Sequence, residues 1–215
     1  TVLPWYDEAT EGRGLFHLGT SYAYADIARG SPVRFLELPE SHLAEVIIDA
    51  GTMEDVANIN AMGAEAALVY GPLSLQSEFV SWWLDRETHP DPFFHGAYGY
   101  VSYFLTGENR RYNRSRGVFD RIKPFENFFR VRDSNGQVHT GIGAWEIAYR
   151  YSYMDLNGNG ASGGRASNHT IGLNWYLNPY TRVMWNYVAS DVTDHPRAGG
   201  VGHADIFQMR CQIDF

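Results

Sequence analysis

The stretch AWEIAYRYSYM, residues 144–154, alternates strictly between large apolar side chains and smaller or charged ones. Because successive side chains of a β-strand point to opposite faces, this stretch predicts a strand with one apolar and one polar face. The apolar set is Trp145, Ile147, Tyr149, Tyr151 and Tyr153, and the opposite set is Glu146, Ala148, Arg150 and Ser152.

The same alternation recurs along the chain, whereas helical periodicity is weak and no apolar run approaches the roughly 20 residues of a spanning helix. Gly-Pro at 71–72 and Asn-Pro-Tyr at 178–180 predict tight turns, and 38–42 predicts another short connection. Longer stretches rich in Gly, Asp and Asn lie at 51–60, 86–93, 156–166 and 192–203. The ten predicted strands are 13–25, 32–38, 42–50, 61–70, 73–86, 93–105, 141–155, 166–178, 181–192 and 203–215.

Composition narrows the class of protein. Aromatic residues make up 15% of the 215 residues, yet the mean hydropathy is only -0.34, a combination compatible with an aromatic girdle on a β-barrel. The formal net charge of -8 argues against nucleic-acid binding. A single cysteine, Cys211, excludes an internal disulfide, and the alternation places it on the lipid-facing side of the last strand.

Alternation alone fits two architectures. A soluble β-barrel or lectin-like sandwich points its apolar face inward, whereas a membrane barrel points it at lipid and fills its lumen with polar side chains. Here the polar faces carry Arg, Glu and Gln, the apolar faces end in Trp or Tyr, and short connections alternate with long ones. We therefore predict an all-β fold, a transmembrane antiparallel β-barrel, with 1–215 as one domain.

One segment, 106–140, breaks the alternation of connection lengths, because a long charged stretch falls on the side of the short turns. Within it, RVRDSNGQVH predicts a small hairpin that turns on Asn135–Gly136. We predict that 106–140 is a rim or plug segment on the periplasmic side.

Several blocks resemble the phosphate-selective porin O and P family. They are FHGAYGYVSYFLTGENRRYN (94–113), GVFDRIKPFENFF (117–129), GAWEIAYRYSYMDLN (143–157) and GLNWYLNPYTRVMWNYV (172–188), with RFLELPESHL (34–43) and GAEAALVYGPLSLQSEF (63–79) upstream. The resemblance implies the C-terminal part of a barrel of about sixteen strands, usually trimeric, whose first strands and signal peptide would precede Thr1. A closed ten-stranded barrel is the alternative. The family resemblance also implies that the constriction loop and most anion-binding basic residues lie in the absent N-terminal half, so phosphate selectivity does not carry over to this chain.

Alternation assigns a charged set to the lumen as a pore wall that tunes selectivity: Arg34, Glu65, Glu78, Glu146, Arg150, Arg182 and Arg210. The alternative is that these side chains form cross-strand ion pairs that only hold the wall together. The last residue, Phe215, ends an alternating strand and resembles the signal read by the outer-membrane assembly machinery.

Two weaker ligand hypotheses concern loops. Asp155, Asn157, Asn159 and Gly160 match the opening of an EF-hand calcium loop, but its twelfth position is Ala166 instead of Glu. A flexible extracellular loop is the simpler interpretation of 156–166. His169, His195 and His203 fall in or beside long loops and could gather around a metal, although incidental placement is the simpler interpretation.

No catalytic motif of the G-x-S-x-G, H-E-x-x-H, P-loop or C-x-x-C type occurs in the sequence, which argues against an enzyme. We predict an outer-membrane porin of a Gram-negative-type bacterium, without cofactor, that passes small anionic or neutral solutes by diffusion. Its expected partners are outer-membrane lipids, the assembly machinery and two further copies of itself. The competing hypothesis is a structural or surface-layer-anchoring barrel that conducts nothing.

Overall fold

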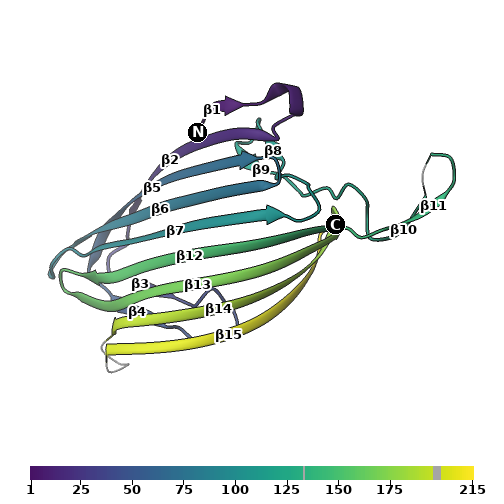
Figure 1. The fold of residues 1–215 in the computed structure, drawn as a ribbon. Helices are drawn as coiled ribbons and strands as arrows, with labels where there is room; N and C mark the ends of the chain where they lie inside the picture. The colour runs from purple at the N-terminus through teal and green to yellow at the C-terminus, as the bar shows by residue number, and fades with distance from the viewer. Residues whose placement is uncertain (133, 196–199) are drawn as a thin grey trace.

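The computed structural model describes residues 1–132, 134–195 and 200–215. Nine antiparallel strands form one curved sheet in which strands adjacent along the wall follow chain order (Figure 1). They are β1 (Val2–Tyr6), β2 (Gly14–Asp26), β5 (Val56–Tyr70), β6 (Leu73–Arg86), β7 (Phe93–Phe104), β12 (Ala144–Gly158), β13 (Ala161–Asn178), β14 (Thr181–His195) and β15 (Gly200–Ile213).

Eight of the ten predicted strands are confirmed as members of this wall. The other two, 32–38 and 42–50, are wrongly assigned to it: they become β3 (Val33–Glu37) and β4 (Ile48–Met53), which pair only with each other among the described residues. The wall gains β1 instead, whose five residues the alternation did not reveal. Residues 27–55 are therefore one long connection between β2 and β5 that carries a hairpin.

The sheet is open. β1 and β15 form its two edges, and no pairing between them closes the sheet within the described residues. The alternative of a closed ten-stranded barrel is therefore wrong for this chain. One short 3-10 helix, η1 (Glu8–Thr10), links β1 to β2.

In the described part of the chain, no helix has both the length and the apolar character to cross a bilayer.

The tight turns predicted at 71–72 and 178–180 are confirmed, because β5 pairs with β6 and β13 with β14 directly across them. The long loop predicted at 156–166 is wrong. Strands β12 and β13 continue pairing to Gly158 and Ala161, so that only Asn159 and Gly160 turn, with Gly160 at φ 73°. The Gly- and Asn-rich residues 156–166 therefore form the end of a β-hairpin and not a flexible loop.

The two faces of the wall differ as the alternation predicts. The convex face leaves large apolar side chains exposed, which soluble proteins avoid over so wide an area. They include Leu18, Tyr22, Met62, Leu75, Phe79, Tyr103, Ile147, Ile171, Leu173, Phe207, Met209 and Ile213. Cys211 is exposed on the same face. The concave face carries the polar set.

The predicted rim or plug segment divides into two parts. Residues 105–127, with the short strands β8 (Tyr112–Asn113) and β9 (Val118–Phe119), fold back over the concave face. The hairpin predicted around Asn135–Gly136 is confirmed as β10 (Phe129–Arg132) and β11 (Val138–Gly141), with Gly136 at φ 80°. Figure 1 shows β10 and β11 projecting beyond the strand ends near the C-terminus.

The main apolar core lies inside the curve of the sheet, not between two sheets. Ile48 and Met53 of the hairpin pack together with Val56, Leu84, Phe94, Leu156, Ala166 and Val192 of the wall strands. Gly163 makes this approach possible, since a Cβ there would stand 2.9 Å from the Ala50 Cα and 2.6 Å from the Leu156 Cβ. Hairpin and wall therefore meet backbone to backbone at one glycine.

We expect Gly163→Ala to lower the free energy of unfolding by about 1–3 kcal/mol, because the added methyl group overpacks the contact between β4 and β13. Chemical unfolding in detergent micelles measures the effect. Gly99→Ala is the matched control, since a Cβ at Gly99 meets nothing within 4 Å. Equal stabilities of the two variants would contradict the close packing of the hairpin on the wall.

Candidate pore constriction

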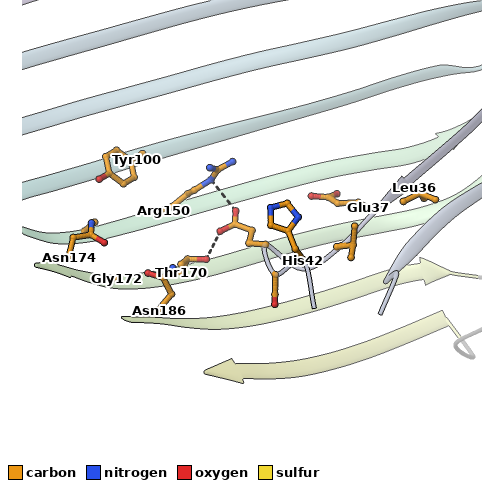
Figure 2. A pocket seen from close by; sticks show the side chains of 13 residues that line it. Leu36, Glu37, His42, Tyr100, Arg150, Thr170, Gly172, Asn174 and Asn186 are labelled. Atoms are coloured by element: carbon orange, nitrogen blue, oxygen red, sulfur yellow. Dashed lines mark hydrogen bonds and ion pairs between the residues drawn. The ribbon is translucent and has the colours of Figure 1, made fainter. Parts of the chain in front are cut away.

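The tip of the β3–β4 hairpin, residues 38–47, descends onto the polar part of the concave wall. Glu40 makes the central contacts: one carboxylate oxygen accepts a hydrogen bond from Ser152 Oγ at 2.6 Å and lies 3.0 Å from Arg150 Nε. The other accepts a hydrogen bond from Thr170 Oγ1 at 2.5 Å. Figure 2 shows the Arg150 and Thr170 contacts. One side chain thus ties the tip to both β12 and β13.

The backbone around Glu40 is shaped for this contact. Glu40 has φ 51°, in the left-handed region that side-chain-bearing residues seldom adopt. Its carbonyl accepts a hydrogen bond from Gln208 Nε2 of β15 at 3.1 Å. Because three strands of the wall hold this residue, the unfavourable conformation is compensated by charged and neutral hydrogen bonds.

A polar cavity of about 580 Å³ opens between the tip and the wall (Figure 2). Its lining mixes both signs of charge with neutral hydrogen-bonding groups, among them Glu37, Glu40, Arg150, Thr170, Asn174 and Asn186. The Arg150 guanidinium also lies over the Tyr98 ring, 4.1 Å from its centroid. Such a lining suits hydrated polar solutes better than apolar ones.

The carboxyl group of Glu37, next to the tip, is largely shielded from water. Burial and, to a smaller extent, the neighbouring Glu40 carboxylate raise the pKa of Glu37, Arg150 opposes them, and the net pKa is about 7. Within the described chain its Oε2 is buried without a hydrogen-bond partner. The hairpin therefore docks most favourably when Glu37 carries its proton.

A second insertion enters the concave side from the opposite end of the strands. Arg110 of the 105–127 segment forms an ion pair with Glu146, whose side chain is fully buried. Tyr176 Oη and Asn174 Nδ2 also donate to Glu146, each at 2.9 Å. Burial lowers the pKa of the Arg110 guanidinium, but the Glu146 charge outweighs burial and leaves that pKa raised.

The same insertion touches the wall near β2. Tyr112 Oη lies 2.6 Å from His17 Nδ1, and His17 Nε2 lies 3.1 Å from a Glu65 oxygen. Residues 105–127 therefore contact the concave side of β2, β7 and β12 through polar side chains.

The register places six of the seven predicted lumen residues on the concave face: Glu65, Glu78, Glu146, Arg150, Arg182 and Arg210. Arg34 is the exception, because β3 is not a wall strand. Its guanidinium instead binds Asp49 across the β3–β4 hairpin, with Nε donating at 3.0 Å. The assignment of Arg34 to the wall is therefore wrong, although it lies on an inserted element.

Cross-strand ion pairs account for only part of the pairing observed along the charged wall. Arg150 pairs with Glu40, and Glu146 pairs with Arg110, so these two wall charges meet inserted segments, whereas Glu65 meets His17 of the neighbouring strand β2. Arg182 donates to the neutral side chain of Gln212 at 2.8 Å and keeps its charge uncompensated by that contact. Arg210 is exposed on the concave face.

Glu40 and Arg110 are the residues that sequence reasoning missed. Glu40 was placed in a short connection between two wall strands, and the resemblance suggested that no constricting segment lies in this part of the family's chain. Nothing local to LPESHL signals an inward fold. For Arg110 the sequence held a partial signal. A long charged segment on the side of the short turns indicates that this segment packs against the wall.

The predicted calcium residues serve the β12–β13 hairpin. Asp155 accepts hydrogen bonds from Arg165 Nε and from the Asn157 amide, both at 2.8 Å. Asn157 Oδ1 accepts from the Gly164 amide, and Asn159 lies in the two-residue turn. Calcium binding stays a prediction, but two of its three expected ligands already have partners.

The three histidines considered for a metal lie on separate strands and form no metal-ligating group among the described residues. His169 of β13 contacts Tyr149, and His203 of β15 lies between Asp191 and Asp205 on the convex side. His195 is the last residue of β14. Phe215 follows β15 and is fully exposed; its role in assembly stays a prediction.

Comparisons with known proteins give a consistent result. The family model described as phosphate-selective porin O and P matches residues 10–215. The chain is 27% identical to Porin O of Pseudomonas aeruginosa over 95% of its own length and 50% of that protein. It is 29% identical to an uncharacterized protein of Caulobacter vibrioides over 82% of its own length and 34% of that protein. The chain thus spans half or less of the length of these relatives.

The Glu37 carboxyl makes hairpin docking depend on pH. Its pKa is about 7 when docked against an ordinary value of 4.5, so the docked state binds the proton more tightly. Docking is strongest below pH 4.5 and weakens as pH rises toward 7 and beyond. We expect amide exchange at residues 33–37 to accelerate by about tenfold more between pH 5 and pH 8 than intrinsic chemistry predicts.

Glu37→Gln provides the control, because the amide keeps the shape and cannot ionise. The variant should show intrinsic pH dependence only. An unchanged pH response in Glu37→Gln would mean that another group governs docking.

Proposed function

Since the chain belongs to the phosphate-selective porin O and P family, whose homologues are outer-membrane porins of Gram-negative bacteria, we propose that it forms part of the wall of a passive diffusion channel. The family is one of channels and not of enzymes. The channel would admit small anionic or neutral solutes, phosphate among them, through a lumen narrowed by two inserted segments.

The dimensions of the convex face support a membrane location. Trp145 and Tyr153 bracket the apolar part of β12 and are eight residues apart. That separation is about 27 Å along the strand, or about 20 Å along a barrel axis at a tilt of about 40°. An outer-membrane barrel carries an apolar band of about 25 Å between its aromatic girdles.

The aromatic side chains at the short-turn end also support this location. Trp145 stacks on Trp175 with ring centroids 5.0 Å apart, and Trp185 lies parallel to Trp145 at 6.4 Å. Amphipathic rings of this kind prefer the membrane–water interface. Lipid around the wall, assembly by the outer-membrane machinery through Phe215, and a homotrimer are parts of the same proposal.

The single observation that carries the channel proposal is the docking of Glu40 on Arg150, Ser152 and Thr170. A hairpin held against the polar wall narrows the lumen while leaving a hydrated cavity beside it. A structural barrel needs no such device, because a lumen that carries nothing has no cross-section to regulate.

We expect Glu40→Ala to raise single-channel conductance in planar bilayers and to add flicker to the open state. The substitution removes a charged contact worth about 1.5–3 kcal/mol per hydrogen bond, so the hairpin leaves the wall more often. Glu45→Ala is the matched control, since Glu45 is an exposed carboxylate of the same tip.

An unchanged conductance in Glu40→Ala would refute the constriction. A complete lack of conductance in the unsubstituted protein, assembled from its full-length chain, would favour the non-conducting structural barrel instead.

Selectivity should depend on the concave arginines that meet no carboxylate in the contacts above. We expect Arg182→Gln combined with Arg210→Gln to lower the permeability of anions relative to cations, because two positive charges leave the lumen wall. Reversal potentials across a salt gradient measure the change. Arg116→Gln, at an exposed position of the 105–127 segment, is the control, and an equal shift there would contradict a wall-specific role.

A further inference from the structure

A basic and aromatic patch lies at the rim of the wall, at its short-turn end. Its sequence, RIKPFENFFRVR, spans residues 121–132 and holds four basic residues, one acidic residue and three phenylalanines. The stretch has a formal charge of +3 in a chain whose net charge is -8. It also contains the only lysine of the sequence, Lys123.

The chain crosses the rim of the sheet within this stretch. Ile122 is buried on the concave side with Phe104, Ala144 and Tyr176. Six residues later, Phe128 packs edge-on against Trp175 of the convex girdle, with centroids 4.6 Å apart. The rim is therefore crossed between residues 122 and 128.

Hydrogen bonds fasten the base of the β10–β11 hairpin to the girdle. The Phe128 amide donates to the Leu177 carbonyl at 2.7 Å. The Ile142 carbonyl accepts from Trp145 Nε1 at 3.2 Å and from Trp175 Nε1 at 2.8 Å. Both ends of the hairpin thus start beside the tryptophans of the proposed membrane interface.

The side chains that leave this base are those of an interfacial anchor. Phe125, Phe129 and Ile142 are each at least 60% exposed, and the basic side chains Arg121, Lys123, Arg130 and Arg132 are all exposed. In the hairpin, Arg130 and Arg132 lie on one face. Their cross-strand partners on β11 are Thr140 and Val138. In water the phenylalanine rings stay exposed, whereas a bilayer surface buries the rings and at the same time binds the arginines.

We propose that residues 121–132, together with β11, bind the anionic headgroups of phospholipids in the leaflet at the short-turn end of the barrel. Charge complementarity selects this occupant over an apolar protein surface, because four exposed cationic side chains lie within the same twelve residues as the phenylalanines. The inference depends on the membrane location proposed above but not on conduction, so the two are tested by different measurements.

The test compares amide hydrogen exchange of the full chain in nanodiscs of phosphatidylcholine alone and of phosphatidylcholine mixed with phosphatidylglycerol. We expect exchange at 129–132 and 138–141 to slow by about fivefold or more in the anionic nanodiscs. Arg130→Gln with Arg132→Gln should abolish this difference, and Arg130→Lys with Arg132→Lys should keep it, which separates charge from folding.

Arg111→Gln with Arg116→Gln is the matched control, since both side chains are exposed on the same connection before the rim crossing. This pair should leave the lipid dependence unchanged. Equal exchange in the two kinds of nanodisc would overturn the proposal. Protection that instead grows with protein concentration in phosphatidylcholine alone would also overturn it, in favour of a second protein copy as the occupant. Single-channel conductance of the Arg130 and Arg132 variants should stay at the unsubstituted value.

Discussion

The two-residue repeat of the β-strand is the constraint on which the molecule depends. Each wall strand presents apolar side chains to one face and polar ones to the other, and backbone pairing leaves neighbouring strands no freedom to invert that choice. Once Trp145 and Ile147 face outward, the register carries Trp175, Leu173 and Trp185 to the same side. The charged wall residues Glu65, Glu78, Glu146, Arg150, Arg182 and Arg210 are then gathered on the concave face, where any segment that enters must bring hydrogen-bonding partners with it.

This constraint explains which parts of the fold the sequence could predict. Wall strands such as β12 and β14 are long enough for their alternation to be unambiguous, and the turns at 71–72 and 178–180 carry their own chemistry. VRFLE, which forms β3, has the composition of a strand over five residues but belongs to an inserted hairpin. The distinction rests on contacts remote in sequence, because Gly163 admits Ala50 and an apolar end of the concave wall accepts Ile48. Strand propensity contains neither fact.

For the candidate site, too, the sequence predicts the direction of the wall side chains but not their partners. The two-residue alternation was sufficient to place Glu146 and Arg150 on the concave side, since the direction of a side chain is a local property of a strand. Whether such a charge faces water or a partner is not local: Glu146 is buried beneath Arg110, and Arg150 is held by Glu40, which lies 110 residues before it in the chain. Arg34 shows the converse error, because its side chain alternates correctly on a strand that is not part of the wall.

The two insertions solve one electrostatic problem from opposite ends of the strands. A charged group on the concave wall is stable while water reaches it, but a segment that covers it removes that water and has to supply the opposite charge. The hairpin from the long-connection side brings Glu40 to Arg150, and the segment from the short-turn side brings Arg110 to Glu146. The carboxylate is on the insertion in one case and on the wall in the other. Covering the wall therefore leaves its net charge almost unchanged, and the uncovered charge resides where no insertion reaches, at wall positions such as Arg210. In the proposed channel, selectivity and cross-section would consequently be set by different residues, so that either could change without disturbing the other.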